Sequence, residues 1–537
     1  MKRYLVTSAL PYANGKLHIG HIAGSNLPAD IFVKFLKLKG EDVIYICGTD
    51  EHGAPITIAA EQQNTTPVEI VKRYHDSMVR DFEGLGFEFE NFSGTARPVH
   101  HKLAQEFFTN LLKKGFINTD TTNQWYDEKA DRFLADRYVE GICPYCGEDG
   151  ARGDQCDACG KLIDAVNLID PKSKITGNTP ILRETKHWYL DLLRFENDLW
   201  VWLESKTYWK ENVRNFILSW LDDGLIQRSI TRDLKWGVPV PLPNAEGKVL
   251  YVWFEAPIGY ISSTIEWSEQ IGKPDKWKEY WLNPDTRMIH FLGKDNIPFH
   301  TIIWPAVLMQ QDKPYVLPYD VPANEYLNLE GQKISTSRNW AVWVEDFLKY
   351  FDGELLRYTL AANAPETKDS DFSWKDFQNR VNKDLADVLG NLANRILRFS
   401  EKHFNSKLST PRTYTESTRQ LLEFIGAQGE KIELCYSTYK VRKAVNLIID
   451  MAREGNRFFD EAEPWKRIKT DRAAAEESLW VCARVLQAVS VFLYPVMPKH
   501  MTTLRKMVGL GDERPVWDDF RKDTPEYVIS DVKVLFL

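Results

Sequence analysis

The sequence predicts an α/β fold: a doubly wound parallel sheet, interrupted by an insertion and followed by an all-helical domain. A short apolar run at 4–7, a helical pattern over about 18–39 and a continuous apolar run at 43–47 predict strand, helix and strand. A buried run without polar alternation is expected for a strand covered on both faces. Strand–helix–strand order places the two strands parallel.

The sheet pattern stops at about 117 and resumes after about 230. The stretch between holds four clustered cysteines and then a Trp-rich helical segment, and sheet-like runs return at 250–254 and 288–292. From about residue 375 the periodicity is almost entirely helical. We therefore expect a Rossmann-like domain in two parts, an insertion, a linker domain and a helical domain. The expected ranges are 1–116 and 231–325 for the two parts, 117–230 for the insertion, 326–385 for the linker domain and 386–537 for the helical domain.

Bulk properties exclude several classes of protein. With 537 residues, 43% hydrophobic and 27% charged, the chain has ordinary globular composition and several domains. The longest apolar run, 479–497, contains Arg484 and Gln487, which predicts a buried helix and no membrane span. A net charge of −8 restricts nucleic-acid binding to local patches. Scattered thiols and no visible signal peptide predict a cytoplasmic protein.

His18 and His21 stand at the start of the first predicted helix, three residues apart and so on one face. Free N–H groups and the helix dipole suit phosphate there. Gly20 has no side chain, so a flat adenine could lie against the backbone. The alternative is a helix with two surface histidines.

A second polar element follows the last sheet-like runs. Lys333 comes after Glu330-Gly331-Gln332 and begins the sequence Lys-Ile-Ser-Thr-Ser over 333–337. A lysine flanked by glycine and hydroxyl groups suits a mobile clamp on a triphosphate. The alternative is a solvated polar loop.

The cysteine spacing indicates a metal site. Each C-x-x-C loop offers two thiolates to one ion, and two loops complete a tetrahedron, so the predicted site is a structural zinc with no open position. Disulfides or chance remain alternatives. The predicted ligands are Cys143, Cys146, Cys156 and Cys159.

Together the histidine and lysine elements resemble the paired H-I-G-H and K-M-S-K-S signatures of class I aminoacyl-tRNA synthetases. The resemblance covers essentially the whole chain. It implies that an amino-acid carboxylate attacks the α-phosphate of ATP, brought with magnesium, and that the adenylate is passed to the 3′ ribose of tRNA. His18 and His21 would then stabilise the phosphate, and Lys333 the pyrophosphate, by donors aimed at developing charge. The resemblance gives the contacts to the ribose hydroxyls to Gly293 and Asp295. The other expected ATP contacts are Gly20, Ser335, Thr336 and Arg338.

One residue departs from the family signature. Thr336 stands where the second lysine is expected, which removes one charge from the clamp. Arg338, two residues further on, would supply that charge. This is a hypothesis motivated by the missing lysine.

Within the class, several segments resemble the methionyl-tRNA synthetase family. The most diagnostic is 251–260, Tyr-Val-Trp-Phe-Glu-Ala-Pro-Ile-Gly-Tyr. The resemblance implies that Asp50 holds the substrate ammonium, with Arg232 orienting Asp50 and the carboxylate. A thioether is apolar and favours aromatic edges, which fits the implied pocket, with Tyr260 or His300 offering a weak donor to sulfur. For Trp253 alone, a core position is the simpler reading. The implied methionine pocket is Ala9, Leu10, Tyr12, Trp253, Ala256, Pro257, Tyr260, Ile297 and His300.

The same family resemblance bears on the insertion and the helical domain. A zinc is expected at the cysteines, and the insertion is too short for the editing domain of leucyl, isoleucyl and valyl relatives. Asn391 and Arg395 share a helix face, and Trp465 follows a Pro464 break. They match the family's anticodon-reading positions and could stack and bond unpaired bases. An ordinary helix surface and a packing tryptophan are the alternative.

The expected function is therefore that of a methionine–tRNA ligase acting on L-methionine, ATP and tRNA(Met), initiator and elongator. Two alternatives stay open: another class I synthetase such as the cysteinyl one, and a catalytically weak tRNA-binding relative. Some family members continue into a dimerising domain that this sequence lacks, so we expect a monomer.

Overall fold

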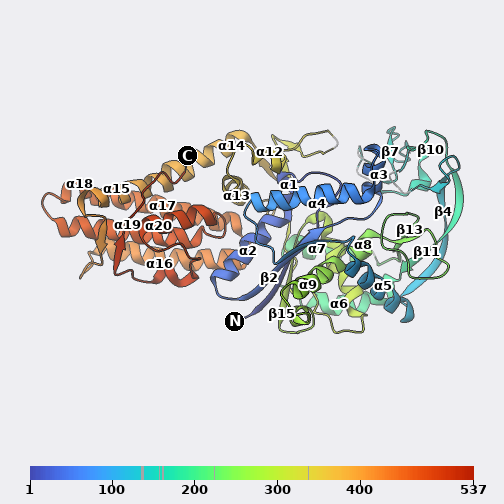
Figure 1. The fold of residues 1–537 in the computed structure, drawn as a ribbon, viewed down its shortest axis with the longest axis horizontal. Helices are drawn as coiled ribbons and strands as arrows, with labels where there is room; N and C mark the ends of the chain where they lie inside the picture. The colour runs from blue at the N-terminus through green and yellow to red at the C-terminus, as the bar shows by residue number, and fades with distance from the viewer. Residues whose placement is uncertain (135–137, 157, 160–161, 223, 337, 537) are drawn as a thin grey trace.

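The molecule is elongated, with the helical domain at one end, the parallel sheet in the middle and the cysteine-bearing insertion at the other end (Figure 1). The computed structural model describes residues 1–134, 138–156, 158–159, 162–222, 224–336 and 338–536. Ser337 of the predicted clamp lies outside the described residues.

The central sheet has five parallel strands in the order β16-β15-β1-β2-β3. Its register pairs Thr7 with His290 on one side and with Ile46 on the other, so the two halves of the domain meet at β1. The strands are β1 (Arg3–Ser8), β2 (Asp42–Thr49), β3 (Asn91–Gly94), β15 (Thr286–Gly293) and β16 (Ala323–Asn324).

Both faces of the sheet are covered, because alternate strand residues enter different cores. Tyr4 and Val6 pack with the helix that follows β1 and with the helical domain, whereas Leu5 packs with helices of the second half. The first face is covered by α1 (Ile19–His21), α2 (Leu27–Leu38) and α4 (Pro67–Gly84), and the second by α5 (Pro98–Lys113), α9 (Ile258–Gln270), α10 (Lys276–Trp281) and α11 (Trp304–Met309). The predicted fold class is confirmed.

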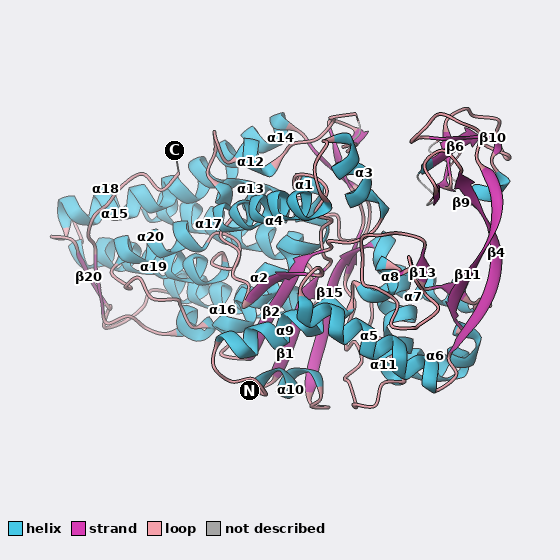
Figure 2. Cartoon of the chain, turned by 45° about the vertical axis from the view of Figure 1, so that its right-hand side comes forward, coloured by secondary structure: helices cyan, strands magenta, loops and turns pink. Residues whose placement is uncertain are grey.

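The insertion is carried by a long antiparallel pair, β4 (Ile117–Asp127) and β11 (Ile181–Leu190), visible at the edge of the molecule in Figure 2. Short strands between them form the cysteine module, and two helices return the chain to the sheet. These elements are β5 (Arg132–Phe133), β6 (Val139–Ile142), β7 (Ala151–Arg152), β8 (Asp154–Gln155), β9 (Leu162–Ile163), β10 (Ile169–Ser173), α6 (Glu196–Glu204), α7 (Glu211–Asp222) and β12 (Arg228–Ser229).

One predicted strand is wrong. The apolar run 250–254 begins as β14 (Val249–Leu250), paired with β13 (Thr231–Arg232), but continues as the helical turn α8 (Val252–Glu255). A short apolar run does not by itself distinguish a strand from a buried helix. The prediction for 288–292 is confirmed, since this run lies within β15.

A small linker connects the sheet to the helical domain. It contains β17 (Leu327–Leu329), β18 (Gln332–Lys333), α12 (Val344–Phe347), α13 (Gly353–Ala362), β19 (Ser370–Phe372) and α14 (Trp374–Asn379). The buried guanidinium of Arg357 contacts Asp30 at 2.7 Å and donates to the carbonyls of Pro495 and Val496, so it ties α2 to the helical domain.

The helical domain packs around α19, whose residues are buried from Ser478 to its end. The predicted buried helix is therefore confirmed, with Gln487 donating to the carbonyl of Lys522. Among the described residues, no helix combines the length and apolar character that a bilayer crossing requires. The elements are α15 (Asn391–His403), β20 (Lys407–Ser409), α16 (Glu416–Ser437), α17 (Val441–Ala462), α18 (Pro464–Arg467), α19 (Arg472–Phe492), α20 (Pro498–Val508) and β21 (Glu526–Val528).

Candidate active site

The predicted active-site residues gather beyond the carboxyl ends of β1, β2 and β15. His18 follows β1, Asp50 directly follows β2, and Gly293 ends β15. In open α/β sheets, ligands bind at this edge. The five-stranded sheet thus brings together residues that lie hundreds of positions apart in the chain.

His18 and His21 both accept backbone hydrogen bonds at Nδ1. Gly20 N–H donates to His18 Nδ1 at 3.1 Å, and His18 N–H donates to His21 Nδ1 at 3.2 Å. Because a backbone N–H can only donate, each neutral ring carries its proton on Nε2. The rings stack with centroids 3.6 Å apart. The pair therefore offers two Nε2–H donors from stacked rings.

Burial keeps both rings uncharged at neutral pH. It lowers the pKa of His18 to about 2, with the neighbouring His21 adding to the effect, and lowers the pKa of His21 to about 4. A neutral imidazole still has one N–H group, so each ring can donate a hydrogen bond to an anionic ligand such as phosphate.

The lysine loop lies against this pair. A Cβ on Gly20 would be 2.9 Å from His18 Nδ1 and 3.2 Å from Ile334 Cδ1, so only glycine leaves this contact open. Val342 accepts from Ile19 N–H at 3.1 Å. The segment after the loop is thus hydrogen-bonded to the start of α1.

Two turns shape the loop. Glu330 and Gly331 both have positive φ, 50° and 74°, and join β17 to β18. Ser335 and Trp340 exchange two backbone bonds of 2.9 Å. The segment they close includes Thr336 and Arg338, both exposed at its tip. The predicted compensating charge therefore lies in the same turn as the threonine.

Lys333 is exposed at the end of β18, and its Nζ lies 5.7 Å from the centre of the Tyr326 ring. Asp295 lies on the same side, since the charges of Lys294 and Lys333 oppose the burial that raises its pKa. A Cβ on Gly293 would be 2.8 Å from Asp295 Oδ1, so the carboxylate lies directly over the end of β15.

Asp50 lies beside Tyr12 at the carboxyl end of β2. Its carboxylate accepts a hydrogen bond from Tyr12, and the backbones of these two residues form a parallel bridge. Burial, and next the charge of Glu255, raise the pKa of Asp50 well above its usual range. A cationic ligand would reverse this effect by favouring the carboxylate.

Tyr260 and His300 form a buried hydrogen-bonded pair in the core of the second half of the domain. His300 Nδ1 lies 3.2 Å from the Asn296 carbonyl, and its Nε2 lies 3.0 Å from the Tyr260 hydroxyl. The carbonyl can only accept, so the neutral ring, whose pKa burial lowers to about 4, accepts from Tyr260. In this arrangement both donors are used within the protein.

Trp253 is 48% exposed, so the simpler reading of it as a core residue is wrong. Its ring lies 4.5 Å from that of Phe299, and the two stand between solvent and the buried residues of the 256–260 turn. Leu10 reaches the same turn, since a Cβ on Gly259 would lie 3.3 Å from Leu10 Cδ1. Ile297 is 2% exposed, and Ala9 donates its N–H to the Phe291 carbonyl.

Arg232 lies differently from the expectation. Its guanidinium stacks on Tyr251 at 3.6 Å and donates to the Ser229 hydroxyl at 3.0 Å and the Thr231 carbonyl at 2.8 Å. None of the bonds found in the described part of the chain joins Arg232 to Asp50. In this conformation Arg232 stabilises the β13–β14 edge.

The four predicted cysteines come together in the insertion. Cys143 and Cys159 have sulfurs 3.9 Å apart, and those of Cys146 and Cys156 are 3.7 Å apart. A tetrahedral zinc with Zn–S bonds of about 2.3 Å has S···S edges of about 3.8 Å, so the donor set fits zinc. Tyr145 N–H donates to the Cys143 sulfur at 3.4 Å, which supports a thiolate.

The cysteine module packs against the catalytic domain close to Asp50. Its small core includes Cys143 and Cys156 and is covered by Ala54 and Ile58 of α3 (Ala54–Gln62). Arg132 adds two hydrogen bonds to the Glu61 carboxylate.

In the helical domain, Arg395 and Trp465 meet at one aromatic ring. Phe459 lies 4.4 Å below the Arg395 guanidinium and 5.8 Å from the Trp465 ring. Trp465 is 39% exposed, and Arg395 is held by Asp460. Asn391 is exposed one turn earlier on α15.

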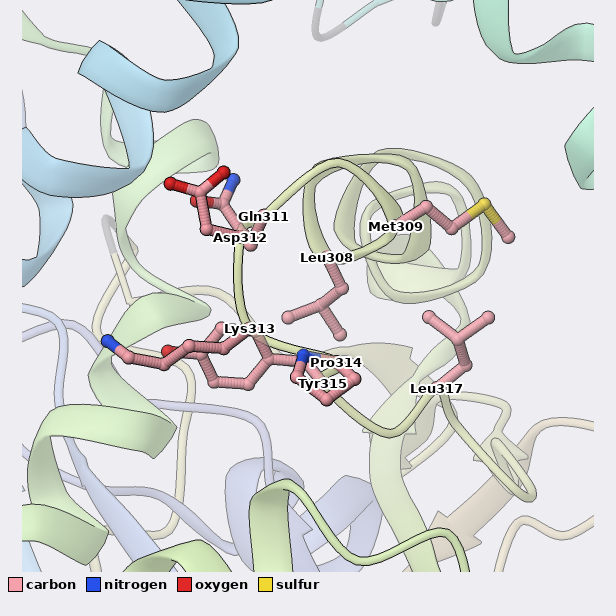
Figure 3. Close-up of a pocket in the computed structure, with 8 residues that line it drawn as sticks. All are labelled: Leu308, Met309, Gln311, Asp312, Lys313, Pro314, Tyr315 and Leu317. Carbon is pink, nitrogen blue, oxygen red and sulfur yellow. The ribbon is translucent and has the colours of Figure 1, made fainter.

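One surface hollow lies away from these residues. A cavity of about 300 Å³ lies between the end of α11 and the segment that follows it, with Leu308, Asp312 and Leu317 in its wall (Figure 3). It contains none of the predicted site residues.

Two family descriptions match the chain, and together they span most of it. Residues 4–397 match tRNA synthetases class I (M), and residues 409–528 match the anticodon binding domain of methionyl tRNA ligase. A methionine–tRNA ligase of Christiangramia forsetii is 46% identical over 525 residues, covering 96% of this chain and 76% of the relative. The chain belongs to the methionyl family of class I tRNA synthetases. The predicted family and enzyme class are confirmed.

Other members of the methionyl family agree. A methionine–tRNA ligase of Rubrobacter xylanophilus is 48% identical over 516 residues, covering 94% of this chain and 89% of the relative. The solved Mycobacterium tuberculosis methionyl-tRNA synthetase in complex with methionyl-adenylate has a TM-score of 0.82 at 25% identity, with all of both chains covered. These matches give no support to the cysteinyl alternative.

Three features next to the predicted residues had no sequence signal of their own. Phe299 covers Trp253, Trp343 lies 6.1 Å from His18, and Glu255 is bonded to two histidines. Glu255 lies directly before Ala256 and Phe299 lies between Ile297 and His300, so both stand within runs that carry predicted residues, but neither was assigned a role.

Proposed function

We propose that the chain joins methionine to ATP and transfers the methionyl group to the 3′ end of tRNA(Met), initiator and elongator alike. The observation that carries the proposal is the pair of neutral Nε2–H donors of His18 and His21, which lies under the Lys333 loop. Phosphate chemistry at this edge of the sheet, in a chain of the methionyl family, is adenylate formation.

In the first step, a carboxylate oxygen of methionine attacks the α-phosphorus of ATP and the bond to the pyrophosphate oxygen breaks. His18 and His21 donate to the oxygens that gain charge in the transition state. Lys333, brought in by its loop, compensates the charge of the leaving pyrophosphate. ATP enters with magnesium, which supplies further charge compensation.

The remaining ATP contacts follow from the geometry at the strand ends. Gly20 leaves room for adenine against α1 once the loop carries Ile334 away from it, and Asp295 beside Gly293 accepts from the ribose hydroxyls. Ser335, Thr336 and Arg338 belong to the loop that closes over the phosphates, with Arg338 in place of the missing lysine.

The amino acid lies between Asp50 and the Tyr260–His300 pair. Asp50 accepts from the ammonium beside Tyr12, and Arg232 orients the carboxylate once it leaves Tyr251. The thioether meets Leu10, Ala256, Pro257 and Ile297, with Ala9 and Trp253 at the mouth. Since selection rests on shape, thioether analogues of similar length are also activated.

In the second step, a 3′-terminal ribose hydroxyl of tRNA attacks the methionyl carbonyl and AMP leaves. Trp465, Arg395 and Asn391 lie on the helical domain, where an aromatic ring, a guanidinium and an amide can stack and bond unpaired bases. Zinc at the four cysteines is structural. We place the enzyme in the cytoplasm, and sedimentation equilibrium of the 537-residue chain tests the monomer predicted from its sequence.

Charging of purified tRNA with radiolabelled methionine tests the proposal. We expect tRNA(Met) of both kinds, and no other tRNA, to accept label in an ATP-dependent reaction. Tight tRNA binding without charging would support the catalytically weak alternative and contradict the proposal.

A further inference from the structure

A buried cluster of three histidines and a glutamate lies beside Asp50, and the mechanism above does not use it. Glu255 and His100 are fully buried, and His52 is 1% exposed. His101 completes the cluster from its partly exposed edge. The four residues come from the turn after β2, from α5 and from α8.

Glu255 is held from both sides. His52 Nδ1 donates to Oε1 at 2.9 Å and His100 Nε2 donates to Oε2 at 2.6 Å. Burial raises the pKa of Glu255, but the two histidines outweigh it and bring that pKa to about 2. His101 Nε2 lies 3.3 Å from His52 Nε2, so each nitrogen of His52 has a partner.

The same group has the donor atoms of a metal site. However, both carboxylate oxygens and both facing nitrogens are already joined in pairs at hydrogen-bond distance. The observed distances are therefore those of a hydrogen-bond network that fixes the carboxylate.

The network leads directly to Asp50. His52 also directs its backbone N–H at Asp50 Oδ1, at 3.5 Å. The intervening Glu51 is fixed independently, because its carboxylate accepts from Ala96 N–H at 2.8 Å and its carbonyl from Trp236 at 2.7 Å. His52 is thus the link between the Asp50 carboxylate and Glu255, which itself precedes Ala256 of the pocket.

We propose that Glu255 is a positioning residue for the substrate's ammonium group: through His52 it holds the Asp50 carboxylate where that ammonium binds. The inference rests on the proposed function, because it takes Asp50 as the ammonium partner. A change at Glu255 should therefore weaken binding of the ammonium group and leave binding of the rest of the ligand unchanged.

Glu255→Gln changes this link with little change of shape. An amide accepts on one side only, so one of the two imidazole N–H groups then faces a second donor. The loss of one buried, charge-assisted hydrogen bond corresponds to roughly tenfold in affinity or more.

Two partial substrates test the proposal as competitive inhibitors of methionine-dependent ATP–pyrophosphate exchange. Methioninol keeps the ammonium and lacks the carboxylate, whereas 4-(methylthio)butanoate keeps the carboxylate and lacks the ammonium. We expect Glu255→Gln to raise the inhibition constant of methioninol tenfold or more and that of the butanoate less than twofold. Equal changes for both compounds, or none, would overturn the proposal.

Glu354→Gln is the matched control, since Glu354 is also buried and bonded to a histidine, His500, but joins the linker helix α13 to the helical domain. It should leave the ratio of the two constants unchanged. If Glu255→Gln does not fold, two substitutions of His52 carry the test.

In His52→Asn an amide N–H lies near the position of His52 Nδ1, whereas His52→Leu has no donor there. We expect His52→Asn to keep the wild-type ratio and His52→Leu to raise the methioninol constant selectively. If His52→Asn and His52→Leu gave the same ratio of the two inhibition constants, the link from Glu255 through His52 to Asp50 would be refuted. A wild-type enzyme with no methionine-dependent exchange would instead refute the proposed function itself.

Discussion

The imidazoles of His18 and His21 act through their protonation state as much as through their position. Each Nδ1 accepts a backbone N–H, and each ring is uncharged at neutral pH because burial lowers its pKa, to about 2 and about 4. In the proposed reaction, the phosphate would meet donors whose direction the backbone has set in advance, which is how preorganised electrostatic catalysis works.

Substitution of His21 tests the direction of the donor. Glutamine places its amide near the position of Nε2, and asparagine places it near Nδ1. We expect His21→Asn to slow methionine activation about 10²–10³-fold, the cost of one lost transition-state donor, and His21→Gln to retain at least about tenfold more activity. Stopped-flow or exchange kinetics measure both, and equal losses would contradict the donor role.

The pH profile is an independent check on the same rings. Since folding lowers both pKa values below that of a free histidine, the rings stay neutral in the fold while the unfolded chain takes up protons below about pH 6.5. Their contribution to stability is therefore complete above about pH 6.5 and declines as the pH falls towards 4 and then 2. An exchange rate that fell as the pH rose through 6.5 would indicate essential rings with the pKa of a free histidine, which we do not expect.

Arg338 tests the charge of the clamp. It shares an exposed turn with Thr336, so we expect Arg338→Ala to lower exchange about tenfold or more, and Thr336→Lys in that background to restore most of it. Arg419→Ala, an exposed arginine of α16, is the control. Wild-type exchange by Arg338→Ala would contradict compensation.

At the scale of elements, sequence patterns predicted best where one physical requirement dominates. The spacing of Cys143, Cys146, Cys156 and Cys159 follows from the geometry of a tetrahedral site, and the structure brings their sulfurs within 4.8 Å. The strand at 43–47 was equally clear, because a run buried on both faces has few alternatives.

Other elements could not be predicted from local pattern. The run 250–254 changes from β14 to α8. Phe254 of α8 packs in the core of the second half of the domain, and a local sequence pattern does not record such contacts. Likewise Arg232 stacks on Tyr251, and Glu255 bonds His52 and His100 from other elements. Contacts between distant segments were the part that sequence reasoning missed.

Zinc removal tests the insertion as a folding unit. We expect Cys159→Ser to reduce bound zinc from about one ion per chain to nearly none, and to lower the melting temperature, because zinc binding contributes to folding. Elemental analysis and calorimetry measure this. Cys435→Ser, at a buried cysteine of α16, should keep its zinc. A zinc content unchanged in Cys159→Ser would contradict the four-cysteine site.

At the scale of the whole molecule, the proposed function gives the helical domain and the central sheet separate tasks. Trp465 lies on the helical domain, at the opposite end from the insertion (Figure 1), whereas the reacting groups lie at the edge of the central sheet. Arg357 joins the two parts through Asp30 and the carbonyls of Pro495 and Val496. Adenylate formation should therefore be insensitive to changes at Trp465.

Trp465→Ala separates the tasks experimentally. Loss of one base-stacking platform costs roughly 1–3 kcal/mol, so we expect tRNA charging to fall about tenfold to a hundredfold in kcat/KM while exchange stays within about twofold. Tyr350→Ala, at an aromatic side chain 80% exposed on the linker, is the control. If both assays fell equally, Trp465 would be a packing residue.

The central claim is that the site between His18 and Lys333 activates methionine. ATP–pyrophosphate exchange with the wild-type protein, measured for each of the twenty amino acids, tests it most directly. We expect exchange with methionine and loss of that exchange in His21→Asn. Exchange with cysteine alone, or with no amino acid, would contradict the account.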